Sequence, residues 1–286
     1  MIRILTVIAL VIATANVVAA QNVCNRFQAV PDRCDLKATA VEQARCLLRP
    51  VKKFAHLGDP LQELPAPLLT LIGQSTATSV THDQLKRYLD AKGIREADVG
   101  GVLSVKLSTP KYFVIHDTSD LLTSTEFPAT INDAASSLNN LSRRVTRKVA
   151  HIYIDRAGHS STAVNFESLT PPSGTKFGLC HRSQRTAFLH IENIQPRIRD
   201  RSVKFPNDAL APEPGFSEAQ LERLALIYVV ASVRSGRWLI PTYHSSIDLG
   251  FPDRHDDPQN FDVQTWAAKL RGLIEEIRNQ IQGDGL

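Results

Sequence analysis

The stretch YFVIHDTS, residues 112–119, decides how the fold of this chain is interpreted. Its first four residues, Tyr112 to Ile115, are aromatic or aliphatic and predict a buried strand. The next four, His116 to Ser119, are polar residues that rarely form a core. In α/β proteins, ligands bind beyond the carboxyl ends of the strands. The stretch therefore predicts a strand that ends on a functional side chain, with His116 as the first candidate.

A second stretch, residues 240–261, repeats this arrangement: IPTYHSSIDLGFPDRHDDPQNF. An apolar strand ends on His244, and the loop that follows carries the carboxylates Asp253, Asp256 and Asp257. Two histidines at strand ends and one loop carboxylate are a ligand set that suits catalytic zinc. Three nitrogen and oxygen ligands leave a fourth position for water, which the metal activates near neutral pH.

A third stretch, AFLHIENIQPR at 187–197, places Glu192 inside an apolar strand. A charge in such a strand needs a partner or a task. Next to an activated water, a carboxylate can accept a proton and pass it to a leaving amine. Taken singly, His116 is more typical of a structural histidine, Glu192 suits a salt bridge equally well, and the acidic cluster is typical of a solvated loop. No local HExxH motif supports a metal site.

The remaining periodicity predicts an α/β fold around one sheet. Ser217 and Gln220 form a capping-box pattern before one amphipathic helix, and Asp262 can cap a second, whose apolar positions continue to Ile281. Further helices are expected over 39–48, 81–91 and 130–144, and further strands over 102–107, 149–155, 187–192 and 238–243.

Composition is that of a globular protein with ample length for a core. The chain has 286 residues, of which 43% are hydrophobic and 22% are charged. The formal charge of +4 comes from 33 basic and 29 acidic residues. This excess is too small and too scattered to predict nucleic-acid binding.

Residues 1–20, MIRILTVIALVIATANVVAA, predict a cleaved secretory signal peptide and therefore a secreted or periplasmic protein. An uncleaved anchor is the alternative, but Asn16 interrupts a span that is short for a bilayer. No stable membrane insertion is expected after cleavage. Residues 21–80 form an irregular region with several prolines. Three of the four cysteines lie there, and all four are expected to form disulfides, with three pairings open among Cys24, Cys34, Cys46 and Cys180.

Four motifs in order resemble the zinc-dependent N-acetylmuramoyl-L-alanine amidases that share a fold with peptidoglycan-recognition proteins. A strand ending in IHHT or IHYT is matched by residues 115–118, and AHYVIDRDG is matched by 150–158. IGIELEN is matched by 189–193, and a histidine with a later Asp-Pro is matched by 244–245 and 257–258. The resemblance covers about 105–275, within an expected amidase domain of 81–286.

The resemblance implies a mixed central β-sheet flanked by helices and a Zn²⁺ ion bound by His116, His244 and Asp257. It implies that Glu192 is the catalytic acid or base, and it places His255 where the family often has an oxyanion-stabilising lysine. The substrate would be the amide between N-acetylmuramic acid and L-alanine in peptidoglycan or muropeptides.

The chain also departs from the family pattern. The loop before Asp257 is longer, and Gln259 replaces a glycine, which leaves Asp256 as an alternative third ligand. Two other functions stay open: a zinc peptidase that cuts the stem peptide, and a non-catalytic peptidoglycan-binding module.

Overall fold

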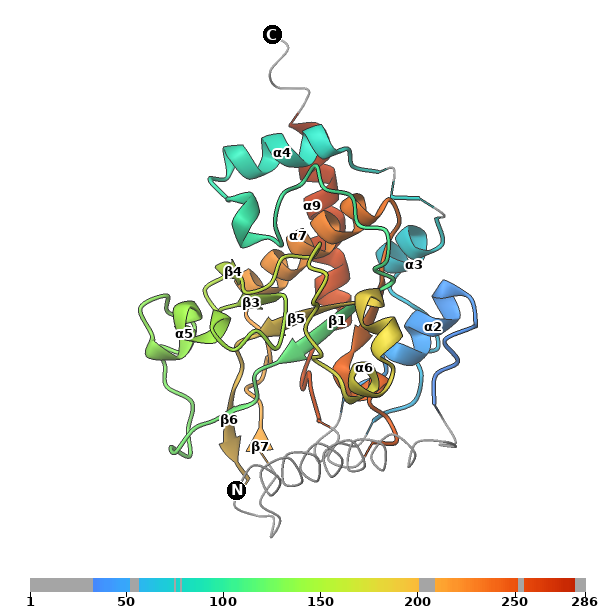
Figure 1. The fold of residues 1–286 in the computed structure, drawn as a ribbon. Helices are drawn as coiled ribbons and strands as arrows, with labels where there is room; N and C mark the ends of the chain where they lie inside the picture. Colours follow the sequence, from blue (N-terminus) through green and yellow to red (C-terminus); the bar gives the residue numbers. More distant parts are fainter. Residues whose placement is uncertain are drawn as a thin grey trace, which may run out of the picture.

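The computed structural model describes residues 33–51, 57–74, 76–77, 79–200, 209–251 and 255–280. The expected signal peptide, Cys24, Asp253 and Ile281 lie outside these residues. The described part is a mixed α/β structure, as the sequence predicts, with a central sheet flanked by helices (Figure 1).

The central sheet has five strands in the order β4-β3-β5-β1-β8. Strands β1, β3, β5 and β8 are parallel, and β4 is antiparallel to β3, so the sheet is mixed. A smaller sheet, β2-β6-β7, continues from the ends of β1 and β5. The strands are β1 Tyr112–Asp117, β2 Asp120–Leu121, β3 Ile152–Ile154, β4 Ser160–Thr162, β5 Phe188–Asn193, β6 Pro196–Arg199, β7 Ala209–Leu210 and β8 Ile240–Tyr243.

One face of the central sheet is covered by two long helices, α7 (Glu218–Ser235) and α9 (Val263–Asn279), which lie side by side (Figure 1). Both begin at the predicted caps: Ser217 forms a capping box with Gln220, and Asp262 accepts two backbone N–H bonds. The ring of Tyr228 packs between Phe113 of the sheet and Trp266 of α9. This face is therefore apolar core.

The opposite face carries the N-terminal helix α2 (Ala40–Leu47) and the short α6 (Lys176–Cys180). Helix α2 packs against β8, and its Gln43 accepts a 2.7 Å hydrogen bond from the Tyr112 hydroxyl. Phe177 of α6 packs edge-on against Phe188 of β5. The other helices are α3 Ala66–Ile72, α4 His82–Ala91, α5 Leu141–Val145 and α8 His244–Ile247, with 3₁₀ turns at Glu96–Asp98, Ser137–Asn139 and Arg182–Ala187.

The N-terminal region is tied down as expected. Thr39 forms a capping box at the start of α2. Cys34, which precedes the helix, is disulfide-bonded to Cys46 near its end. Cys180 is disulfide-bonded as well. One continuous hydrophobic cluster includes residues of this region, such as Leu47 and Leu68, and the strands of the central sheet.

Two predicted elements are wrong. Residues 102–107 form no strand, because the N–H of Leu103 bonds the Glu96 carboxylate and the N–H of Leu107 bonds the Arg234 carbonyl. Residues 130–144 form turns and short helical pieces instead of one helix. There the amide group of Asn139 donates to the carbonyls of Ile131 and Asp133, a competition with helix bonds that asparagine favours.

Candidate metal centre

Three of the predicted residues meet at the carboxyl ends of two neighbouring strands. His116 lies near the end of β1, and His244 follows β8 directly as the first residue of α8. Because β1 and β8 are parallel neighbours, the two histidines emerge at the same edge of the sheet. The loop before α9 brings Asp257 to them. One possible ligand atom from each of His116, His244 and Asp257 lies within 4.8 Å of the others.

The donor set fits a zinc ion. The Nδ1 atoms of His116 and His244 lie 3.5 and 3.0 Å from Oδ2 of Asp257. All three residues are at most 6% exposed. The Oδ1 atom of Asp257 is buried, forms no hydrogen bond with described residues, and lies 3.0 Å from Nδ1 of His244 as part of an ion pair. Two imidazole nitrogens and one carboxylate are a donor set of the kind that holds zinc through three protein ligands.

In each histidine, Nε2 contacts a second side chain, so Nδ1 is the ring nitrogen that faces Asp257. Nε2 of His116 lies 3.0 Å from Nδ1 of His190, and Nε2 of His244 lies 2.9 Å from Oδ2 of Asp248. If both Nε2 atoms carry the proton and donate it, both Nδ1 lone pairs are free for a metal. Asp248 is fixed in turn by the backbone N–H groups of residues 176 and 177 at the start of α6.

Electrostatics divides the histidines into two groups. Burial lowers the pKa of His116 to about 4 and of His151 to about 3, and it lowers the pKa of His190 well below its ordinary value. Burial acts in the same direction on His244, but Asp257 and Asp248 together raise its pKa well above the usual range. Without a metal, His244 and Asp257 therefore form a buried ion pair.

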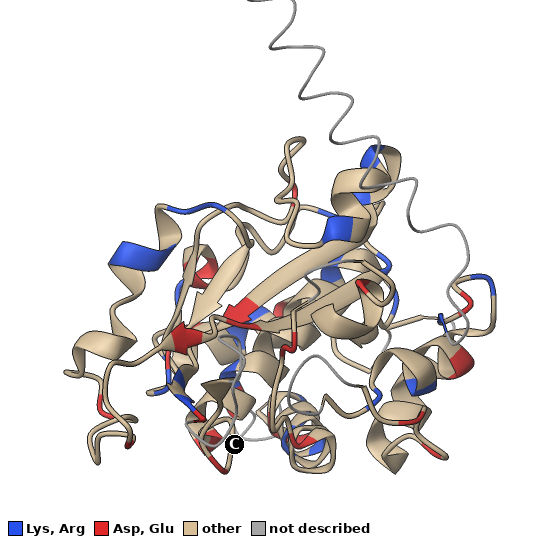
Figure 2. Cartoon of the chain, turned by 90° about the horizontal axis from the view of Figure 1, so that it is seen from below, with Lys and Arg blue, Asp and Glu red and all other residues tan. Residues whose placement is uncertain are grey.

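Glu192 lies next to this group and is half-buried. In the register of the sheet it pairs with His116 on one side and with Tyr153 of β3 on the other, so the three side chains share one face. Burial, and then the charge of Asp257, raise the pKa of Glu192 well above its ordinary value. Its Oε2 atom and the Tyr153 hydroxyl are both buried, and neither has a hydrogen-bond partner among the described residues. In Figure 2, the red at the ends of the central strands marks their acidic residues.

The two remaining loop candidates are placed differently. The exposed His255 stacks its ring on that of His244, with centroids 4.9 Å apart. The protein atoms around its ring still remove part of its hydration, and this is the main reason why the pKa of His255 is lowered. Asp256 turns away from the centre and accepts hydrogen bonds from Arg197 at 3.1 Å and from the side chain of Gln259 at 2.6 Å. The geometry therefore favours Asp257 over Asp256 as the third ligand.

A buried ion pair supports the ligand loop. Arg197 of β6 is 1% exposed and donates to both oxygens of Asp117, at 2.9 and 2.7 Å. Asp117 also accepts the backbone N–H of Gln259, and its own N–H lies 3.4 Å from Oδ2 of Asp257. The end of β1 is thereby connected to the segment that carries the third ligand.

Sequence reasoning missed two supporting residues, Asp248 and Arg197, and gave a third, His190, only a pocket-lining or structural role outside the metal shell. Asp248 stands four residues after His244, a spacing that a helical turn brings together, and this signal was available. His190 stands two residues before Glu192 and so shares its strand face. Arg197 carried no signal in the sequence, because its partner Asp117 is 80 positions away.

No family model, curated protein or solved structure matches this chain. In the part of the chain that the structure describes, no helix has the length and apolar character to cross a membrane.

Proposed function

We propose that this protein is a zinc-dependent amidase that hydrolyses the bond between N-acetylmuramic acid and L-alanine in peptidoglycan. The observation that carries the proposal is the convergence of His116, His244 and Asp257 beside Glu192. The choice of this amide rests on the four motifs that resemble the amidase family. A secreted or periplasmic location accords with the Cys34–Cys46 disulfide, since such bonds persist in oxidising compartments.

Each residue of the site has its own role in the proposed hydrolysis. His116, His244 and Asp257 would hold Zn²⁺, which when bound supplies a Lewis acid that polarises the amide carbonyl and activates water. Glu192 takes a proton from the attacking water as its oxygen bonds to the carbonyl carbon. Glu192 then gives this proton to the amine nitrogen as the C–N bond breaks. His255, at the exposed edge, donates an N–H to the oxyanion that develops on the carbonyl oxygen.

The test is a digestion of purified peptidoglycan, with and without a chelator, followed by mass spectrometry of the products. We expect free stem peptides that begin with L-alanine, their loss on chelation and their return with added zinc. Cleavage inside the stem peptide would replace the proposal with a zinc peptidase. Binding without cleavage, in a protein that takes up no zinc, would replace it with a recognition module.

A further inference from the structure

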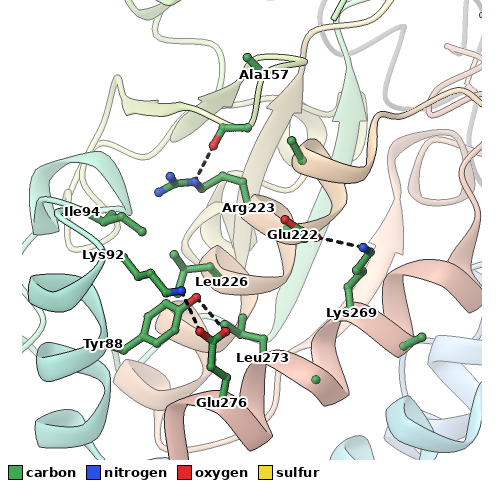
Figure 3. Close-up of a pocket in the computed structure, with 14 residues that line it drawn as sticks. Tyr88, Lys92, Ile94, Ala157, Glu222, Arg223, Leu226, Lys269, Leu273 and Glu276 are labelled. Carbon is green, nitrogen blue, oxygen red and sulfur yellow. Dashed lines mark hydrogen bonds and ion pairs between the residues drawn. The ribbon is translucent and has the colours of Figure 1, made fainter. Parts of the chain in front are cut away.

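A second hollow lies on the helix side of the sheet, away from the metal centre. It is bounded by α4, α7, α9 and the turn between β3 and β4 (Figure 3). Its volume is about 600 Å³, within the range of small-molecule sites. None of the candidate zinc ligands lines it, so any ligand here is independent of the proposed amidase function.

Two of the three cations that line the hollow are already neutralised. Nζ of Lys92 lies 2.8 Å from the Glu276 carboxylate, and Nζ of Lys269 lies 2.9 Å from that of Glu222 (Figure 3). These pairs cross from α4 to α9 and from α7 to α9. Both lysines are therefore paired with carboxylates of the protein, so neither is the first candidate to bind the charge of an external ligand.

Arg223 is the third cation. The charges of Asp98 and Asp155 act on it, but neither carboxylate forms an ion pair with it. Its Nε donates a 2.8 Å hydrogen bond to the Gly158 carbonyl, which holds the guanidinium at the wall of the hollow (Figure 3). Among the residues that the structure describes, Arg223 forms no ion pair, and its Nη atoms form no hydrogen bond. The side chain is half-buried, and burial lowers its pKa. A half-buried guanidinium with free donors is complementary to a carboxylate or phosphate, which it can bind through two parallel bonds.

Gly272 supplies a second, independent observation. It lies within α9, where glycine costs about 1 kcal/mol relative to alanine. A Cβ atom added at Gly272 meets nothing within 4 Å, so packing does not require a glycine there. Gly272 is exposed and lines the hollow, so an alanine fits there and only a longer side chain would enter the space.

We propose that this hollow binds a small ligand that carries a carboxylate and a short aliphatic group. Arg223 receives the carboxylate. The aliphatic group contacts the apolar part of the wall, which is formed by Ile94, Ala219, Leu226 and Leu273.

The probe is N-acetyl-L-valine, titrated into the isotope-labelled protein and followed by NMR chemical shifts. N-acetyl-L-valine amide, which lacks the negative charge, and inorganic phosphate are titrated in parallel. We expect saturable binding of the carboxylate only. Arg223→Met, which keeps the aliphatic stem, should weaken binding at least about tenfold, because a charge-assisted hydrogen bond is lost.

Two variants of Gly272 test whether binding requires the open volume of the hollow. Gly272→Leu should block binding, while Gly272→Ala should bind the probe and melt at a higher temperature than the wild type. Melting curves establish that each variant is folded. The proposal is overturned if the wild type shows no saturable shift, if the amide binds as well as the acid, if only phosphate binds, or if Arg223→Met binds normally.

Discussion

Glu192 is the residue on which turnover should depend most directly. It shares a strand face with His116 but is not one of the three ligands, so Glu192→Gln removes the proton carrier and leaves the metal set intact. We expect zinc content to be unchanged and kcat on peptidoglycan fragments to fall by about 10²- to 10⁴-fold. Metal analysis and product release are measured on the same preparation. Full activity with full zinc occupancy would remove Glu192 from the mechanism.

Asp248 should control how tightly the metal is held. Its Oδ2 atom lies 2.9 Å from Nε2 of His244 and fixes the tautomer that frees Nδ1. In Asp248→Asn the charge is lost while an acceptor oxygen remains, so we expect zinc affinity to fall by about 10- to 100-fold. Competition with a chromogenic chelator measures this.

Asp262→Asn is the matched control for Asp248→Asn. Asp262 caps α9 and is not among the groups that face the ligands, and asparagine is an equally good cap. Its zinc affinity should equal that of the wild type. Equal affinity in both variants would show that Asp248 does not orient His244.

At the scale of elements, the Arg197–Asp117 pair joins β6 to the end of β1. Arg197→Met leaves the Asp117 carboxylate buried without its charge partner, which should cost about 3–5 kcal/mol in the free energy of unfolding. Asp117→Asn in the same chain removes that stranded charge and should restore much of the loss. Urea unfolding of the two single variants and the double variant measures the coupling. Additive losses would mean that the pair does not act as a unit.

Some elements and contacts could be predicted from the sequence, and others could not. The regular spacing of apolar residues and the caps at Ser217 and Asp262 predicted both long helices, because each signal is local. The convergence of His116 and His244 was expected because each ends an apolar strand, but only the structure shows that the two strands are parallel neighbours. Asp248 was missed, and the contact of His190 with His116 could not be foreseen, because these roles depend on the position of α6 and on strand register.

At the scale of the whole molecule, buried neutral histidines make stability depend on pH. The pKa of His151 is about 3 in the folded protein, because burial penalises its charged form. In the unfolded chain it returns to about 6.5. Between these values the unfolded state binds more protons, so stability is fully present above pH 6.5 and is lost as the pH falls toward 3. His151 alone contributes a slope of about 1.4 kcal/mol per pH unit in this window.

Urea unfolding of the metal-free protein between pH 7.5 and pH 4.5 tests this prediction, and His151→Gln is the informative variant. Glutamine cannot titrate, and its carbonyl can still accept the backbone N–H of His190 that Nδ1 of His151 accepts. The variant should show a shallower dependence on pH, by about one proton taken up on unfolding, whatever its stability at pH 7.5. An unchanged slope would mean that His151 is already protonated in the folded protein, and that this face of the sheet is more hydrated than its burial indicates.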